Sequence, residues 1–279
     1  MKLGFFGANV GGMASDEAGE LAARGEELGY HSLWTADHAI LPKPRQPKPP
    51  LDPDWPIMDP LVTLGYLAAF TDRIELCTGI LVLTQRGPVQ LAKAAATVDV
   101  LSRGRLVLGV GVGYVVPEFR ATGVPMERRR ARFREHLAAL RAMWTMDDPQ
   151  FHGDFVEFDG IDAYPRPIQE GGPRLVLGGA TPLALRDAAA LGTGWYGFGQ
   201  TPDEVAEARE LMVRHADAIG RDLKDFQITV TPRARLTTEL VSAYESAGVD
   251  QLVVSVEADT TDGVRKRLEL NAPATLGLV

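Results

Sequence analysis

Short apolar runs rich in Val, Ile and Leu alternate along this chain with longer segments whose apolar residues recur every three or four positions. Such runs favour β-strands, and such segments favour amphipathic helices. Several runs, including RLVLGVGV from Arg105 and DQLVVSV from Asp250, are apolar at successive positions and predict parallel strands covered on both faces. We expect eight strands, at residues 2–6, 31–35, 74–82, 105–112, 174–178, 193–198, 226–231 and 250–256.

Helix start and stop signals stand between these strands. Ser15 is a candidate cap for a first helix that Gly29 would end. Apolar stripes predict further helices over residues 88–102 and 127–144. Thr201 is followed by proline and, three residues after the threonine, by glutamate, which is the pattern of a capping box.

Eight such units in 279 residues fit a (β/α)₈ barrel, whose typical length is about 250 residues. An open, doubly wound sheet is the alternative. However, eight strands with single crossovers fill the chain and leave no residues for a separate substrate domain. No linker rich in Gly and Ser divides the sequence. We therefore expect one α/β domain, a TIM barrel over residues 1–279.

Two segments interrupt the alternation. Eight of the 19 prolines lie between residues 38 and 60, which excludes a helix or a central strand there. Because loops after barrel strands build the active-site face, segment 39–60 is a candidate lid or substrate wall. The alternative is a disordered insertion. In segment 150–172, alternation and the Asp159-Gly160 pair predict a small hairpin.

Composition and motifs narrow the function classes. The 29 basic and 37 acidic residues give a net charge of −8, so binding to nucleic acid or to an anionic membrane is not expected. The single cysteine, Cys77, provides neither a disulfide nor a multi-cysteine metal site. Metalloprotease, P-loop and serine-hydrolase motifs are absent, and we expect no metal. With no signal-peptide pattern or long apolar run, we expect a cytoplasmic protein.

Asp37 and His38 directly follow the second predicted strand, where the chain enters the proline-rich loop. In a barrel, ionisable residues at the carboxyl end of a strand point into the active site. His38 could transfer a proton near neutral pH, while Asp37 orients a ring or a donor. The alternative is an aspartate that caps the following turn, with an exposed histidine beside it.

Glycines alternate at the end of the fourth predicted strand, at Gly109, Gly111 and Gly113, directly before Tyr114. Alternate glycines remove side chains from one face of a strand, so that a flat ring or a backbone can come close. The pattern lacks the third glycine of the dinucleotide fingerprint at the required spacing, which argues against a Rossmann fold.

Gly178, Gly179 and Ala180 follow the fifth predicted strand and precede Thr-Pro. Such a turn exposes backbone N–H groups at a helix N-terminus, where a phosphate can bind. It would serve equally as an ordinary βα turn. The five arginines between residues 128 and 134 favour a solvated helix face, with contact to an acidic cofactor tail as the alternative.

Residues 77–114, CTGILVLTQRGPVQLAKAAATVDVLSRGRLVLGVGVGY, closely resemble the luciferase-like monooxygenase family. The resemblance extends to SLWTADH at 32–38 and to LGGATPLALRDAAALGTGW at 177–195, and so covers most of the chain in order. The most specific marks are Pro88, which opens a helix, and the Gly104-Arg105 pair before the glycine strand.

The resemblance implies a TIM barrel that binds a flavin or the deazaflavin coenzyme F420, with the ring at the carboxyl end of the barrel. Within the family, the sequence is more similar to the F420-dependent oxidoreductases than to the light-emitting or alkanesulfonate branches. Members often carry a non-prolyl cis peptide behind the ring, which by alignment falls at Thr78, Gly79 and Ile80. The resemblance also favours Asp37 for ring contact and His38 for proton handling.

One position departs from the family pattern. The F420-dependent sugar-phosphate dehydrogenase has a glutamate, its proposed acid, where Tyr114 stands here. The difference argues against that substrate and that acid–base pair, because a tyrosine with a pKa of about 10 is a poor proton-transfer partner without help. The expected catalytic residues are His38 and Tyr114. The expected cofactor contacts are Asp37, Thr78, Gly79, Ile80, Gly111, Gly113, Gly178, Gly179 and Ala180.

These observations lead to three functional hypotheses. The first is an oxidoreductase that transfers a hydride between F420 and a small organic substrate. The second is an FMN-dependent monooxygenase that uses reduced flavin and oxygen, and the third is an F420-binding protein without turnover. Because dimers are common in the family, we also expect a homodimer.

Overall fold

The computed structural model describes residues 1–49 and 51–278, and in it eight parallel strands close into a barrel. They are β1 (Lys2–Phe6), β2 (Ser32–Thr35), β3 (Glu75–Thr78), β5 (Leu106–Gly111), β8 (Arg174–Gly178), β9 (Gly194–Phe198), β10 (Gln227–Thr231) and β11 (Gln251–Ser255). The order around the ring is β3-β2-β1-β11-β10-β9-β8-β5, and pairing of β3 with β5 closes it. The predicted barrel is confirmed.

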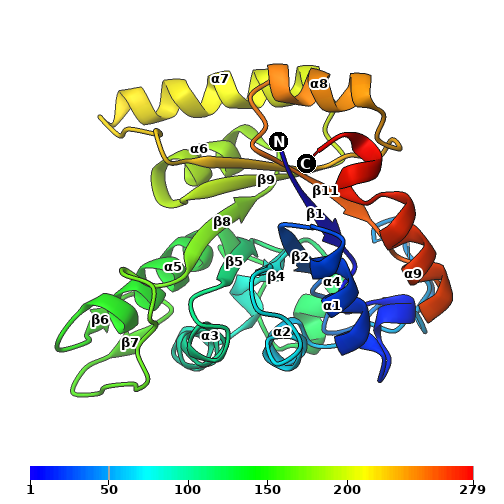
Figure 1. Cartoon of the computed structure of the whole chain (residues 1–279). Coiled ribbons are helices and arrows are strands. Elements are labelled where there is room, and N and C mark those ends of the chain that lie inside the picture. Colours follow the sequence, from blue (N-terminus) through cyan, green and yellow to red (C-terminus); the bar gives the residue numbers. More distant parts are fainter. Residues whose placement is uncertain (50, 279) are drawn as a thin grey trace.

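A helix follows each barrel strand, and the helices surround the strands in Figure 1. Short 3₁₀ turns lie at Gly11–Met13, Leu83–Gln85 and Pro273–Leu276. The helices are α1 (Ala18–Glu27), α2 (Pro60–Leu67), α3 (Pro88–Leu101), α4 (Val116–Ala121), α5 (Arg129–Thr145), α6 (Pro182–Leu191), α7 (Pro202–Ala218), α8 (Thr238–Ser246) and α9 (Thr261–Leu270).

The helix caps match the sequence signals at some ends and differ at others. Thr201 and Glu204 form the predicted capping box of α7, and Thr181 caps α6 by accepting a hydrogen bond from Ala184 N. Ser15 does not cap α1, because its hydroxyl donates to a backbone oxygen three residues earlier and the helix begins later, at Ala18.

The strand predicted over residues 74–82 is interrupted. β3 ends at Thr78, the Gly79–Ile80 peptide bond is cis, and pairing resumes at the two-residue strand β4 (Leu81–Val82), which pairs with the end of β5. The predicted single strand is therefore two short strands, separated by Gly79 and Ile80. The cis bond expected at this place is confirmed.

Apolar side chains fill both sides of the barrel wall, which explains why its strands are apolar at successive positions. The larger cluster lies between strands and helices. Trp34 and Tyr196 stack inside the barrel with ring centroids 4.9 Å apart. The other members of this inner cluster are Phe6, Cys77, Val107, Val176 and Val253.

The proline-rich loop packs on the chain that follows β1. Met58 N donates to Asn9 O, and Gly11 N donates to Pro56 O. An isolated bridge joins Ile57 to the same segment. The carboxyl half of the loop is thereby fixed beside the carboxyl end of β1.

The second interruption contains a two-stranded antiparallel pair, β6 (Phe151–His152) and β7 (Glu157–Phe158), which projects from the barrel in Figure 1. Its turn lies at residues 153–156, where Gly153 N donates to Val156 O. The Asp159-Gly160 pair therefore follows the second strand and does not form the turn. Across residues 1–49 and 51–278, no helix is long and apolar enough to span a membrane.

Candidate active site

The loops after the barrel strands gather at the carboxyl ends of the strands, where TIM-barrel enzymes have their active sites. We call this end of the barrel the mouth. Two exposed aromatic side chains stand there, Tyr114 after β5 and Phe198 at the end of β9. The residues expected from the sequence to form the site belong to four strand ends around this opening, those of β2, β3, β5 and β8.

His38 is paired with a buried carboxylate. Its Nδ1 lies 3.3 Å from Oε2 of Glu118, and the other carboxylate oxygen accepts a hydrogen bond from Ala39 N at 2.6 Å. Glu118 belongs to the first turn of α4 and is only 1% exposed. A carboxylate that accepts a hydrogen bond from Nδ1–H fixes the imidazole tautomer, which leaves Nε2 as the nitrogen able to accept a proton.

Tyr114 lies edge-on to the His38 ring, with centroids 6.2 Å apart. Burial raises the pKa of the Tyr114 hydroxyl, and the nearby charge of Glu118 raises it further. The phenol therefore keeps its proton at neutral pH and can donate a hydrogen bond to a ligand. The structure brings His38 and Tyr114 together, with Glu118 as a third member of the group.

Asp37 is buried and already has partners for both carboxylate oxygens. One oxygen accepts from Val82 N at 2.7 Å, and the other accepts from the Arg86 guanidinium at 2.8 Å. Arg86 also lies 3.0 Å from Asp59, the cap of α2. Asp37 thus ties the end of β2 to the segment after the cis bond, which supports a positioning role.

The Ile80 side chain occupies the mouth between the ends of β5 and β8. A Cβ atom at Gly178 would stand 1.9 Å from Ile80 Cδ1, and one at Gly111 would stand 3.1 Å from its Cγ2. These two glycines make room for Ile80 rather than directly for a cofactor ring. Ile80 also packs against the inner apolar cluster, so it forms part of the floor of the mouth.

The remaining glycines near the cis bond admit protein groups as well. A Cβ atom at Gly109 would stand 1.9 Å from the backbone oxygen of Thr78, whose hydroxyl donates to Gly109 O. Thr78 is fully buried. Gly113 has φ 78°, and a Cβ there would meet Val82 at 2.6 Å. The alternate glycines therefore make room for protein atoms, a backbone oxygen at Gly109 and side chains at Gly111 and Gly113.

Gly179 and Ala180 are arranged as an exposed turn before α6. Gly179 has φ 110°, a conformation that side-chain-bearing residues rarely adopt, and its carbonyl accepts from Trp195. The first turn of α6 contacts α5 through Arg130, which donates to Leu183 O at 2.6 Å. Gly179 and Ala180 are exposed at the N-terminus of α6, where one N–H group of the first turn, that of Ala184, is already capped by Thr181.

The arginine run is mostly engaged with protein groups. Arg130 and Arg134 both pair with the buried Asp187, and Arg128 pairs with Asp154. Arg129 differs, because its Nε is buried and has no hydrogen-bond partner in the described part of the chain. The run therefore contacts mainly protein groups, and the Nε of Arg129 is a buried donor that is left unpaired in the described part of the chain.

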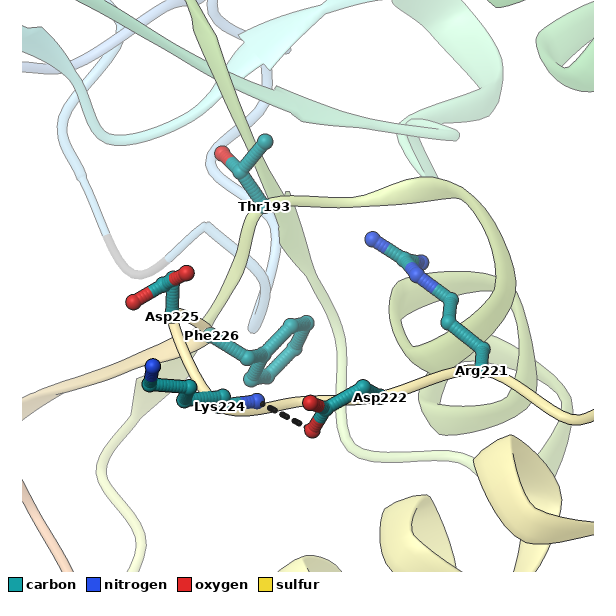
Figure 2. Close-up of a pocket in the computed structure, with 6 residues that line it drawn as sticks. All are labelled: Thr193, Arg221, Asp222, Lys224, Asp225 and Phe226. Atoms are coloured by element: carbon teal, nitrogen blue, oxygen red, sulfur yellow. Dashed lines mark hydrogen bonds between the residues drawn. The ribbon is translucent and has the colours of Figure 1, made fainter.

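A surface hollow of about 190 Å³ lies at the opposite end of the barrel. Thr193 directly precedes β9 and Phe226 directly precedes β10, so the hollow is at the amino ends of these strands. Arg221 already donates to two backbone oxygens, those of Ala189 and Gly192. Figure 2 shows the residues that line this hollow, which are Thr193, Arg221, Asp222, Lys224, Asp225 and Phe226. None of them is an expected site residue.

Sequence reasoning missed Glu118 and Arg86. An acidic residue in the first turn of a helix is ordinary, because it stabilises the helix dipole, so Glu118 had no distinguishing signal. Its contact with His38 depends on the approach of α4 to the end of β2, and the two residues are 80 positions apart.

Over residues 1–49 and 51–278, no cluster of His, Cys, Asp and Glu is suited to a metal ion.

Among known proteins, the chain is 35% identical over 205 residues to an uncharacterised protein of Mycobacterium tuberculosis, which is 71% of this chain and 72% of that protein. It is 32% identical over 180 residues to an F420-dependent glucose-6-phosphate dehydrogenase of Amycolatopsis mediterranei, covering 63% of this chain and 51% of that one. An FMNH₂-dependent dimethylsulfone monooxygenase of Pseudomonas putida is 35% identical over 139 residues, 48% of this chain and 38% of that one.

Solved structures share the fold. An F420-dependent secondary alcohol dehydrogenase with a bound F420–acetone adduct superimposes with a TM-score of 0.81 at 17% identity, over 99% of this chain and 97% of that one. A monooxygenase from Streptomyces bottropensis gives 0.70 at 25% identity, over 99% and 80%. The model of the luciferase-like monooxygenase family matches residues 1–271. The chain belongs to the luciferase-like monooxygenase family.

Proposed function

We propose that this protein is an oxidoreductase that transfers a hydride between coenzyme F420 and a small organic substrate. The observation that carries the proposal is the His38–Glu118 pair at the mouth of the barrel. Hydride transfer to or from an oxygen-bearing carbon requires a proton to move at that oxygen, and an oriented imidazole is suited to this step. The similarity to the F420-dependent dehydrogenase of Amycolatopsis supports the same cofactor.

The residues at the mouth fit such a cofactor. Ile80 supplies an apolar floor for a flat ring, and Tyr114 and Phe198 stand exposed at the rim. The exposed turn at Gly179 and the α6 N-terminus would hold the phosphate. The unpartnered Nε of Arg129, which is next in sequence to the arginine that contacts α6, would add a positive charge there.

Each residue then has a defined task. When bound, F420 supplies or accepts the hydride at its ring. His38 Nε2 accepts the proton from a substrate hydroxyl in the oxidising direction and returns it in the other. Glu118 orients the imidazole and stabilises its charged form, and Tyr114 donates a hydrogen bond. Asp37 and Arg86 keep the cis-bond segment, and therefore Ile80, in place.

The second candidate is an FMN-dependent monooxygenase, which the similarity to the dimethylsulfone monooxygenase favours. The third is an F420-binding protein without turnover. Oxygen consumption by the reduced, cofactor-loaded protein would support the monooxygenase. Tight F420 binding with no reaction across a broad panel of alcohols, aldehydes and enones would support the binding protein.

The test of the catalytic proposal is His38→Asn, because asparagine cannot exchange the proton. Turnover should fall by about 10² to 10⁴-fold, the usual contribution of a general acid or base, with nearly normal cofactor affinity. Equal turnover in variant and parent would mean that His38 is only a loop residue. Lost F420 binding with normal turnover per bound coenzyme would reassign His38 to ring placement.

We also propose a cytoplasmic homodimer built on one barrel domain, with segment 39–60 as a wall of the substrate site. Val62, Tyr66 and Phe70 form an exposed apolar stripe along and just beyond α2, spaced four residues apart. Two copies of one such stripe can pack against each other about a twofold axis. Sedimentation should give a dimer for the parent and a monomer for Tyr66→Glu.

A further inference from the structure

The rim of the mouth between β9 and β11 carries polar groups that the proposed mechanism does not use. Val253 of β11 points into the barrel, so Ser255, two residues later, lies on the same face of the strand. Glu257 follows at the same spacing. The Ser255 hydroxyl donates to Oε2 of Glu257 at 3.0 Å.

Glu257 is seated against the end of β1. Gly7 has φ 102°, and a Cβ atom there would stand 2.7 Å from Glu257 Cγ, so only glycine leaves room for this side chain. Burial raises the pKa of Glu257, although the hydrogen bond from Ser255 and the charge of Arg267 act in the opposite direction. In the part of the chain that the structure describes, Glu257 forms no ion pair.

Glu257 lies at the opening of the barrel, because its side chain contacts Gly7 beyond the carboxyl end of β1 and Ser255 at the carboxyl end of β11. Burial raises the pKa of the Tyr196 hydroxyl, and the charge of Glu257 raises it further. Tyr196 itself is tied to Thr231 by a 2.6 Å hydrogen bond. Phe198, which is 55% exposed, packs edge-on against Phe6 on the same side of the mouth.

The two sides of the mouth therefore differ in chemistry. The side of β2 and β5 carries the imidazole–carboxylate pair that handles a proton. The side of β9 and β11 offers the exposed Phe198 ring and the Glu257 carboxyl group, which forms no ion pair in the described part of the chain, although the charge of Arg267 acts on it. A substrate held between the two sides would meet the Glu257 carboxyl group at the end remote from His38. This group accepts hydrogen bonds and, when ionised, carries a negative charge.

We propose that Glu257, oriented by Ser255, selects the substrate at this site: it accepts a hydrogen bond from a donor group and favours cationic or neutral substrates over anionic ones. The proposal rests on the proposed function, because it assumes that the mouth holds a substrate beside F420. It assigns to this enzyme amines, alcohols or polyols rather than phosphorylated or carboxylated compounds.

Three probes that share one ring and differ in charge test the proposal: cyclohexylamine, cyclohexanol and cyclohexanecarboxylate. Their binding to F420-loaded protein is measured by calorimetry at pH 8, where the amine is cationic and the acid anionic. The parent should bind the amine most tightly and the carboxylate least tightly. Glu257→Gln should weaken amine binding about tenfold and reduce the difference between the probes, because the charge-assisted hydrogen bond is lost.

The control variants separate this role from folding and from cofactor binding. Glu207→Gln removes a charge from an exposed position of α7 and should leave the ranking unchanged. Glu257→Asp keeps the charge and should retain the preference for the amine. An unchanged ranking in Glu257→Gln, or parent protein that does not bind the amine, would overturn the proposal.

The F420 titration distinguishes the failure of this proposal from the failure of the proposed function. F420 affinity should be the same in the parent and in Glu257→Gln. If the parent does not bind F420, the proposed cofactor is wrong, and the probe ranking is then measured with FMN-loaded protein, where the same two outcomes decide the role of Glu257.

Discussion

Glu118→Gln is the sharpest perturbation of the proposed proton-transfer group, because glutamine keeps the size and shape of the side chain. Its amide oxygen would take the place of Oε1, which accepts from Ala39 N at 2.6 Å. The amide nitrogen would then stand where Oε2 lies 3.3 Å from His38 Nδ1. Since an amide NH₂ can only donate, Nδ1 must accept, and the imidazole proton moves to Nε2.

In the wrong tautomer, Nε2 of His38 carries the proton and cannot act as the base in the oxidising direction. In the reducing direction, the loss of the carboxylate charge destabilises the protonated imidazole, which donates the proton. We therefore expect turnover to fall by about 10² to 10⁴-fold, roughly 3 to 5 kcal/mol in the barrier. Both hydrogen bonds survive in altered form, so the cost to folding should be about 1 kcal/mol, a fall in Tm of about 2 to 4 °C.

The assay follows the visible absorbance of F420 with the best substrate found in a panel of alcohols, aldehydes and enones. F420 affinity and far-ultraviolet circular dichroism are measured in parallel. Glu127→Gln, which removes one charge from an exposed site before α5, is the matched control. Turnover of Glu118→Gln within about twofold of the parent, at normal F420 affinity, would refute the role of the pair.

Three other perturbations test the rest of the account. Gly178→Ala should displace Ile80, because the new Cβ would stand 1.9 Å from Ile80 Cδ1. The free energy of unfolding, measured by thermal unfolding, should fall by about 1 to 3 kcal/mol. Adding Ile80→Val removes Cδ1 and should restore most of the lost stability. Ala180→Asp places a negative charge at the exposed turn and should weaken F420 binding at least tenfold, about 1.4 kcal/mol. Binding of the deazaflavin core without its phosphate should not change. Equal weakening for both ligands would show that the turn does not bind the phosphate. Burial acts to raise the pKa of Glu75, but His31, whose Nε2 lies 3.3 Å from Oε1 of Glu75, and the neighbouring Arg174 outweigh this effect and leave the pKa below its ordinary value. This carboxylate therefore stabilises the fold above the unfolded pKa of about 4.5 and loses that effect on acidification, so the Tm difference between the parent and Glu75→Gln should narrow from pH 7 to pH 4.

The sequence predicted the barrel because its signals are local and repeated. Apolar runs covered on both faces, capping residues such as Thr181 and Thr201, and the spacing of the units each act over a few residues. The cis bond at Gly79 came from the family resemblance, and no local pattern predicts that the strand over 74–82 would break there. The turn of the hairpin was misplaced because Asp-Gly is a strong turn signal wherever it stands.

The site was harder to predict because its contacts join distant parts of the chain. Gly111 and Gly178 were interpreted as space for a ring, but the atom that fills this space is a side chain of Ile80, which no pattern connects to them. Glu118, in the helix that follows Tyr114, supplies a carboxylate beside His38. Only the approach of α4 to the end of β2 shows this contact.

The central claim is that the mouth of this barrel binds F420 and uses it, and a parallel titration of F420 and FMN under identical conditions tests it most directly. Fluorescence of each cofactor is followed at equal ionic strength and pH, so that differences in charge screening do not bias the comparison. We predict saturable binding of F420 with a lower Kd than that of FMN. Tighter binding of FMN would contradict the account.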